Sequence, residues 1–316
     1  MSRNFIQLQK GYSLLQFEKD FPDEEACRRR VERDKWPQGF RCRFCEGTAA
    51  WRFSRGPTAL PHWQCQTCGQ MESLIAGTLF EHTRLPLRTW FLACALLSQA
   101  KTQISALELR RQLGVNDKTA LLLKHKIMAA AAAAEEGRVL GCRVELDDAY
   151  LGGVRHGGSS GRGAAGKIPI LVAVETDADL HPRHAVFSAV AAFTRDVLKA
   201  WGKEHLVEST LVLTDGLDCF KALENCEHEP HNMSVEGKAV ADTDFKWVNT
   251  VLGNIKTAFR GVLHAFDHFH YGGRYLGFIQ FLFNHRFDLV ACFGELISLG
   301  SSSPPRSARM LRGEAA

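Results

Sequence analysis

Two hydrophobic rhythms divide the chain. Between residues 85 and 135, apolar residues recur every three to four positions, a spacing that predicts helices. LPLRTWFLACALLSQAK predicts one helix with Pro86 near its start, where a missing N–H costs little. ISALELRRQLGVNDKTALLLKHKIM predicts helix, turn and helix around Gly114 and Asn116. That spacing fits either a helix-turn-helix, whose second helix enters the major groove of DNA, or an ordinary helix pair packed in a core.

Strand and helix patterns alternate in the second half of the chain, which predicts an α/β domain. The predicted strands include residues 144–148, 168–175, 184–190 and 209–214, and the predicted helices include residues 194–206 and 247–259. A hairpin-rich sheet, a crossover helix and a further strand that ends in Asp form the order expected of a ribonuclease-H-like domain. The first and later strands of such a domain are neighbours, so side chains at their ends can meet.

Composition and charge add little to this division. The chain has 316 residues, of which 45% are hydrophobic and 23% charged, an ordinary globular composition with room for more than one domain. The formal net charge is +4 and the pI is about 8.5. This balance permits a nucleic-acid partner without arguing for one, so a basic binding surface would have to be local.

Cysteine usage and hydropathy predict a cytoplasmic protein without a membrane segment. Six of the ten cysteines are scattered without regular spacing, and the N-terminus MSRNFIQLQKGYSLL lacks a continuous apolar run, so we expect reduced thiols rather than a secreted disulfide scaffold. The longest apolar stretches, around residues 90–97 and 275–283, fall short of the roughly 20 residues that a membrane span requires.

The other four cysteines form two C-x-x-C pairs with 19 residues between them, Cys42 with Cys45 and Cys65 with Cys68. Four thiolates in two such turns suit a structural Zn²⁺ ion with no open coordination site. Two chance pairs or a redox motif are the alternatives, and the match between the pairs favours zinc. The sequence therefore predicts a zinc ribbon, a module that binds nucleic acid or protein.

Acidic residues end two of the predicted strands. Asp147 and Asp148 follow an alternating strand pattern, and Asp215 follows the apolar run of STLVLTDG. A single Asp at a strand end is ordinarily a turn or capping residue, but facing carboxylates repel unless a divalent cation lies between them. Oxygen ligands suit Mg²⁺ or Mn²⁺. Two such ions about 3.5–4 Å apart can activate an attacking oxygen and stabilise a leaving oxygen in phosphodiester chemistry.

Three stretches of this half, VELDDAYLGG, LVLTDGLDCF and WVNTVLGNIKTAFRGVLHAF, carry a family resemblance when taken with the zinc ribbon ahead of them. They are similar to the DDE transposases of ISXO-like bacterial insertion sequences, relatives of the eukaryotic Merlin elements. MESLIAGTLFEHTRLPLRTWF and GRGAAGKIPILVAVE fit the same family. The resemblance covers residues 25–290, and the motifs agree in order and spacing.

The resemblance implies three catalytic residues. Asp147 stands at the first catalytic aspartate of the family pattern V-E-x-D-E-x-Y-x-G-G, and Asp148 stands where the family often has Glu. Asp215 stands at the second aspartate, in T-D-G. The third residue is usually a Glu seven positions, or two helical turns, before a Lys or Arg on the same helix face. Counting back seven residues from Lys256 reaches Asn249.

Asn249 departs from the usual glutamate. An asparagine offers a carbonyl oxygen to a metal but no charge, so the second ion would be held less tightly. Because the family includes members with Asn at this position, the resemblance implies a D-D-N site in which Asp147, Asp215 and Asn249 bind Mg²⁺ or Mn²⁺. Other acidic or amide side chains nearby are candidates for the third ligand: Glu236, Asp242, Asp244 and Asn254.

Two basic residues follow Asn249 on the same predicted helix. Lys256 and Arg260 are four residues apart, so they share a face and could contact the phosphate backbone. A solvated basic face without a ligand is the alternative.

The motifs predict four segments. We expect an N-terminal segment with the zinc ribbon at residues 1–80, a helical DNA-binding segment at 81–138, a ribonuclease-H-like transposase domain at 139–295 and a disordered tail at 296–316, where Ser, Pro and Arg are frequent. The resemblance implies an insertion-sequence transposase that binds terminal inverted repeats and target DNA as a homo-oligomer, in the cytoplasm and associated with the nucleoid.

Two other functions remain open from the sequence. Asn249, in place of the usual glutamate, is consistent with a DNA-binding regulator or domesticated protein whose catalytic domain has decayed. A junction resolvase of the ribonuclease-H-like class would also use such carboxylates, but it would have little use for a ribbon and a helical segment.

Overall fold

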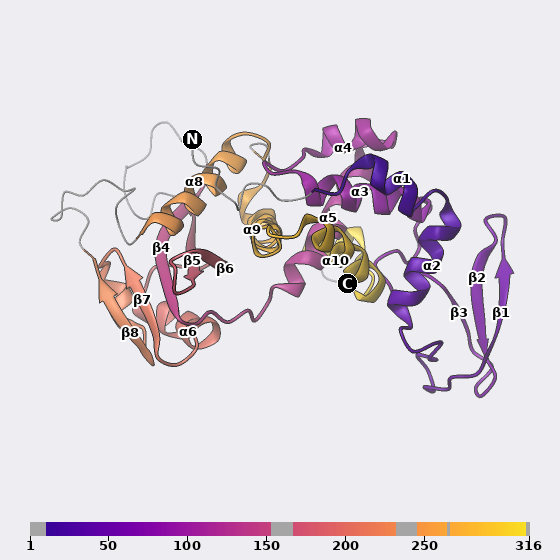
Figure 1. Ribbon diagram of the computed structural model, residues 1–316, viewed down its shortest axis with the longest axis horizontal. Helices are drawn as coiled ribbons and strands as arrows, with labels where there is room; N and C mark the ends of the chain where they lie inside the picture. Colours follow the sequence, from indigo (N-terminus) through magenta and orange to yellow (C-terminus); the bar gives the residue numbers. More distant parts are fainter. Residues whose placement is uncertain (1–10, 153–166, 232–244, 264–265, 314–316) are drawn as a thin grey trace. The chain divides into compact units, whose positions relative to one another are not determined.

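The computed structural model describes residues 11–152, 167–231, 245–263 and 266–313 (Figure 1). The chain forms two compact units. The first contains residues 1–100, 106–130 and 287–316, and the second contains residues 101–105 and 131–286. The boundary falls within helix α5 (Asp117–Ala134), which therefore contributes residues to both units.

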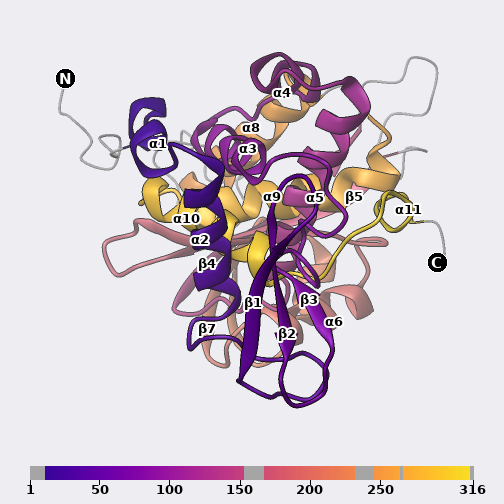
Figure 2. The ribbon, with the colours of Figure 1, turned by 90° about the vertical axis from the view of Figure 1, so that its right-hand side faces the viewer.

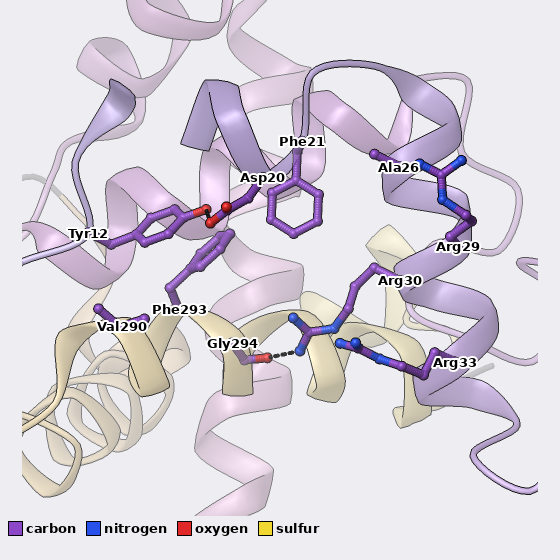
Figure 3. A pocket seen from close by; sticks show the side chains of 10 residues that line it. All are labelled: Tyr12, Asp20, Phe21, Ala26, Arg29, Arg30, Arg33, Val290, Phe293 and Gly294. Atoms are coloured by element: carbon purple, nitrogen blue, oxygen red, sulfur yellow. Dashed lines mark hydrogen bonds between the residues drawn. The ribbon is translucent and has the colours of Figure 1, made fainter. Parts of the chain in front are cut away.

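Helices α1 (Leu14–Asp20), α2 (Glu24–Lys35), α3 (Leu87–Gln99) and α10 (Leu289–Ser302) build most of the first unit. Their core is aromatic: Phe21 meets Phe91 and Phe293 edge-on, at centroid distances of 4.9 and 5.9 Å. Arg30 of α2 donates a hydrogen bond of 2.9 Å to the carbonyl oxygen of Gly294 in α10, next to a pocket that both helices line (Figure 3). The last long helix of the chain is thus a structural part of the N-terminal unit.

The predicted disorder of residues 296–316 is wrong for the part that the structure describes. Helix α10 continues to Ser302, a short helix α11 spans Ala308–Leu311, and Leu296 and Leu311 are buried. Gly300 explains the close packing of α10, because a Cβ there would lie only 2.5 Å from the ring of Phe80. The apolar face of α10 outweighs the Ser-rich composition, which already includes Ser298, Ser301 and Ser302 of the helix; the two prolines follow only after the helix ends.

Strands β1 (Ala50–Arg55), β2 (Leu60–Cys65) and β3 (Met71–Ser73) form an antiparallel sheet in the same unit, beside α2 in Figure 2. Trp63 of β2 is buried against Trp36, which ends α2. Lys35 donates hydrogen bonds to the carbonyl oxygens of Ser73, Leu74 and Ala76 and pairs with Glu72 at 2.6 Å. One buried lysine therefore joins the sheet to α2.

The helices predicted between residues 85 and 135 are confirmed as α3, α4 (Ala106–Leu113) and α5. Gly114 ends α4 with a φ of +66°, a conformation that favours glycine. Asn116 then caps α5, because its Oδ1 accepts a hydrogen bond of 2.8 Å from the N–H of Thr119. Two helices with a three-residue turn are thus present, and their contact with DNA stays a prediction.

The second unit is built on a five-stranded mixed sheet, in the order β6-β5-β4-β7-β8. The strands are β4 (Arg143–Leu151), β5 (Ile168–Thr176), β6 (Pro182–Ala189), β7 (Thr210–Thr214) and β8 (Cys226–Pro230). Strands β4, β5 and β6 pair antiparallel, whereas β7 runs parallel to both β4 and β8. The α/β prediction is confirmed, with β4 at the centre of the sheet.

Helices cover the two faces of this sheet. Val144 and Leu146 of β4 pack in a core with α6 (Arg195–His205) and the 3₁₀ helix η2 (Asp218–Ala222). Helix α8 (Lys246–Arg260) packs against β4 and β5, and α9 (His268–Asn284) packs against β6. Because side chains alternate along a strand, odd-numbered residues of β4 face away from the α6 core. The hydrogen bond from the N–H of Trp247 in α8 to the Glu145 carboxylate confirms this orientation.

Strand β8 was not among the predicted strands. Its sequence, CEHEP, has no alternation of apolar residues, and Glu227 and Glu229 are exposed at the edge of the sheet. Charged residues of this kind protect an edge strand from pairing with other chains.

In the described part of the chain, every helix is too short or too polar to cross a lipid bilayer.

Candidate active site and zinc centre

The carboxylates meet where the parallel pairing of β4 with β7 ends. The prediction that Asp147 and Asp148 end their strand is wrong, because β4 continues to Leu151 in its pairing with β5. The last residue pair between β4 and β7 is Leu146 with Thr214, so Asp147 and Asp215 come next on neighbouring strands. One carboxylate oxygen from each of Asp147, Asp148 and Asp215 lies within 4.8 Å of the others. The structure therefore brings together the two aspartates that the sequence singles out, and it adds Asp148.

Crowding of negative charge marks this cluster. Burial, together with the carboxylates of Asp215 and Asp148, raises the pKa of Asp147 to about 6, against the opposing effects of the Asp148 N–H and the Lys256 ammonium. The Asp148 N–H donates to Asp147 Oδ1 at 2.8 Å. Three converging carboxylates, one of them buried enough to raise its pKa, are the donor set of a hard divalent cation. The cluster therefore fits Mg²⁺ or Mn²⁺.

The turn that carries Asp215 is fixed by its own neighbours. Oγ1 of the fully buried Thr214 lies 2.8 Å from Nε2 of His228 on β8 and also accepts a hydrogen bond from the N–H of Gly216. Burial lowers the pKa of His228, so the neutral ring can accept a hydrogen bond from the Thr214 hydroxyl. Asp215 Oδ1 accepts from the N–H of Leu217, and Gly216 has a φ of +82°. These bonds hold the aspartate at the strand end.

Asn249 lies in the first turn of α8, the helix that packs on β4 (Figure 1). Its Nδ2 donates a hydrogen bond of 2.9 Å to the carbonyl oxygen of Phe245. Since a carbonyl oxygen can only accept, the atom of the Asn249 amide that faces Phe245 must be the nitrogen. The Asn249 Oδ1 bonds to no described group. The amide is thus oriented with its oxygen available for a cation.

Lys256 of α8 lies near the carboxylate cluster. Lys256 is close enough to Asp147 to lower the pKa of that carboxyl, and it lies seven residues after Asn249, on the same helix face. Lys256 and Arg260 are both exposed. Of the other candidates for the third ligand, Asn254 is exposed on α8, whereas Glu236, Asp242 and Asp244 lie outside the described residues.

Glu145 is a member of the site that sequence reasoning missed. Its Oε2 accepts hydrogen bonds of 2.8 and 2.9 Å from the N–H groups of Trp247 and Val248, and its Oε1 pairs with Arg143 at 3.2 Å. Burial raises the pKa of this carboxyl. The signal in the sequence was parity: Glu145 lies two residues before Asp147 on one strand, so both face the same side.

The four cysteines of the ribbon form a second cluster. Their sulfur atoms lie within 4.8 Å of one another, with Cys42 3.6 Å from Cys68 and Cys45 3.5 Å from Cys65. Each pair begins a tight turn that is closed by a backbone hydrogen bond, from Glu46 to Cys42 and from Gly69 to Cys65. The N–H of Cys68 lowers the pKa of the Cys65 thiol. Four converging thiols of this kind fit one tetrahedral Zn²⁺ ion.

Sequence comparison agrees with both clusters. Residues 138–284 match the ISXO2-like transposase domain, and residues 22–71 match the transposase zinc-ribbon domain. The chain carries an ISXO2-like transposase domain and a transposase zinc ribbon. A protein described as an uncharacterized protein in transposable element ISH50 of Halobacterium salinarum is 26% identical over 220 residues, which cover 65% of this chain and 72% of that protein.

This transposase carries both clusters inside the matched regions. The four cysteines lie in the zinc-ribbon match, and Asp147, Asp215 and Asn249 lie in the transposase-domain match. The resemblance seen in the motifs is thereby confirmed, and the protein is an insertion-sequence transposase.

Proposed function

We propose that this transposase cuts DNA at the ends of its element and joins the freed 3′-hydroxyl to target DNA, with Asp147, Asp215 and Asn249 as catalytic residues. The observation that carries the proposal is the meeting of Asp147 and Asp215 on adjacent strands, directly after the last parallel pair of β4 and β7. Burial and the neighbouring carboxylates raise the pKa of Asp147, and perturbed carboxyl groups of this kind are typical of functional sites.

A ribonuclease-H-like fold of the second unit is part of this proposal; the predicted range 139–295 extends too far, because residues 287–295 belong to the first unit. Three antiparallel strands, a crossover helix and a parallel strand beside the first are the expected elements of such a domain, and β4–β6, α6 and β7 follow that order. The first strand is central, and Asp147 follows its last parallel pair with β7, beside Asp215. Helix α8 then adds the third residue from the face of the sheet opposite α6.

Asp147, Asp215 and Asn249 would hold two Mg²⁺ or Mn²⁺ ions, with Asp148 as a further oxygen donor. When bound, the ions would activate the attacking oxygen and stabilise the leaving oxygen of the phosphodiester. Asp147 is central among these residues, since the charges of Asp215, Asp148 and Lys256 all act on it. Asn249 supplies a neutral oxygen whose direction is set by its bond to Phe245.

The remaining surfaces would position DNA. Lys256 and Arg260 follow Asn249 along the same face of α8, and both are exposed. They would therefore contact the phosphates next to the scissile bond. The zinc ribbon within residues 1–80 and the helices within 81–138 would hold the terminal inverted repeats. Two element ends must be processed together, so we expect a homo-oligomer on DNA, in the cytoplasm and associated with the nucleoid.

A strand-transfer assay tests the proposal. The substrate is a duplex that ends in the element's inverted repeat with a pre-cut 3′-hydroxyl, incubated with target plasmid, Mn²⁺ and the full-length protein. We expect joined product from the wild type and none from Asp215→Asn. A folded sample that binds the repeat but joins nothing would instead identify a decayed, DNA-binding copy. Cutting of branched DNA without joining would identify a resolvase.

A further inference from the structure

The first turn of α8 lacks a cap of its own. Phe245 occupies the N-cap position and makes no capping side-chain hydrogen bond, and the first turn contains no acidic residue. The N–H groups at a helix start have no partner within the helix, and leaving them unpaired when buried is costly. Another part of the chain must therefore satisfy them.

Glu145 does so from the centre of the sheet. Its carboxylate accepts hydrogen bonds from the N–H groups of Trp247 and Val248, 102 and 103 residues further along the chain. Glu145 is only 2% exposed, so both bonds are shielded from water. The negative charge also lies at the positive end of the helix dipole, where it is stabilising. A buried, two-bond tie thus joins β4 to the start of α8.

The tie joins the two elements that carry Asp147 and Asn249. Glu145 and Asp147 are alternate residues of β4 and face the same side of the sheet. Asn249 directly follows Val248, the second residue that Glu145 holds, and its amide bonds to Phe245 within the same turn. Sliding or turning α8 would therefore move the Asn249 oxygen relative to Asp147.

We propose that Glu145 is a positioning residue of this transposase, which caps α8 from β4 and so holds the Asn249 oxygen beside Asp147 and Asp215. The inference rests on the proposed catalytic role of Asn249. Glu145 itself touches neither DNA nor metal in this account; Oε1 is engaged by Arg143 and Oε2 by α8. Trp247 adds a second anchor, since its Nε1 donates to the carbonyl oxygen of Leu180 in the turn between β5 and β6.

Asp267 offers a matched control within the same unit. Its Oδ1 accepts hydrogen bonds from the N–H groups of Phe269 and His270 at the start of α9, so it performs the same capping chemistry on another helix. Loss of either carboxylate frees two first-turn N–H groups. Only the loss of Glu145 should disturb the Asn249 oxygen.

The experiment compares Glu145→Ala, Glu145→Gln and Asp267→Ala in the full-length protein. Hydrogen exchange without metal should show about tenfold faster exchange of the first α8 amides in Glu145→Ala, with Glu145→Gln in between because one amide oxygen can still accept both bonds. In cleavage assays, Glu145→Ala should raise the half-saturating Mn²⁺ concentration by about tenfold at unchanged DNA affinity, as loss of a supporting partner does. Asp267→Ala should alter the exchange of α9 and leave the Mn²⁺ dependence unchanged.

Two results would overturn the inference. One is loss of cleavage in a Glu145 variant whose α8 amides exchange at the wild-type rate, which would assign Glu145 another role. The other is faster exchange of α8 with an unchanged Mn²⁺ dependence, which would make the cap purely structural. If Glu145→Ala does not fold, Glu145→Gln decides between the same outcomes. Absence of cleavage by the wild type would instead count against the proposed function, while the exchange measurement still tests the tie.

Discussion

The four cysteines of the ribbon lie within residues 42–68, on two matching turns, whereas Asp147, Asp215 and Asn249 come from β4, the end of β7 and α8. Local hydrogen bonds shape each cysteine turn, and one ion would satisfy all four thiols. The carboxylate cluster forms only after a sheet and a helix have packed, and its charges repel one another in the metal-free protein. Ligands that are close in sequence can form a structural metal site through local turns alone. Ligands that are far apart in sequence, as in the proposed active site, depend on the packing of the whole domain.

The largest expected effect is the loss of the zinc centre. Cys65→Ala removes one of the four ligands, so the ribbon should lose its Zn²⁺ and the amides of β1–β3 should lose their protection. The amides of β4 and β5 should keep theirs, because that sheet belongs to the other compact unit. Zinc content and hydrogen exchange measure both. Cys226→Ala, outside the cluster, is the control, and equal loss of protection in β4 would show that the two sites are not separate.

Asp147→Asn should separate catalysis from stability. We expect cleavage to fall by at least about a hundredfold, since the central metal ligand loses its charge. The metal-free protein should nevertheless become more stable, because the folded state raises the pKa of Asp147 to about 6.

The direction of this stability change follows from proton linkage. The stabilisation that the raised pKa confers is fully present below the ordinary value of 3.8 and is lost as the pH rises through about 6. Asp147→Asn should therefore gain at most about 3 kcal/mol over the wild type above pH 6, and little below pH 4. Urea unfolding in EDTA at pH 4 and pH 7.5 measures this, and an unchanged difference between the two pH values would contradict it.

Asn249 tests the third part of the assembled site. Asn249→Ala removes the oxygen that the amide offers, so the half-saturating Mn²⁺ concentration for cleavage should rise about 10- to 100-fold. Asn249→Glu restores an oxygen and adds a charge, but it loses the bond to Phe245, so it should fall between the wild type and Ala. Activity that is indifferent to both changes would show that Asn249 is not the third ligand.

The smallest effect concerns the open face of α8. A Cβ at Gly253 would meet nothing within 4 Å, so Gly253→Ala should stabilise the helix by about 0.5–1 kcal/mol. Gly277 of α9 is the contrasting case, because a Cβ there would lie 2.6 Å from the Cβ of Ala132. Gly277→Ala should therefore destabilise the unit. If Gly253→Ala destabilises it as well, this face of α8 is packed rather than open to DNA.

How far the sequence predicts each region follows from the same contrast. The cysteine spacing and the alternating strands are local patterns, so the ribbon, β4–β7 and the helices could be predicted. Strand β8 has no apolar alternation, and the packing of α10 on α2 and α3 depends on partners about 200 to 270 residues away, as Arg30 with Gly294 shows.

Within the active site, the same limit separates Asp147 from Glu145. Family motifs single out Asp147 and Asp215, and the register of β4 with β7 explains why they meet. The role of Glu145 could not be predicted, because its partners are backbone N–H groups of a distant helix. Asp148 was not among the three catalytic residues that the resemblance implies, yet its carboxylate lies within the cluster.

The most direct test of the central claim is cleavage of a plasmid that carries the element's two ends, taken from the DNA that flanks the coding region. Wild-type protein and Asp147→Asn and Asp215→Asn variants are compared in Mn²⁺ at equal DNA binding. The account predicts cuts at the element ends by the wild type and none by either variant. Equal cutting by an aspartate variant, or no cutting by a wild type that binds the ends, would contradict it.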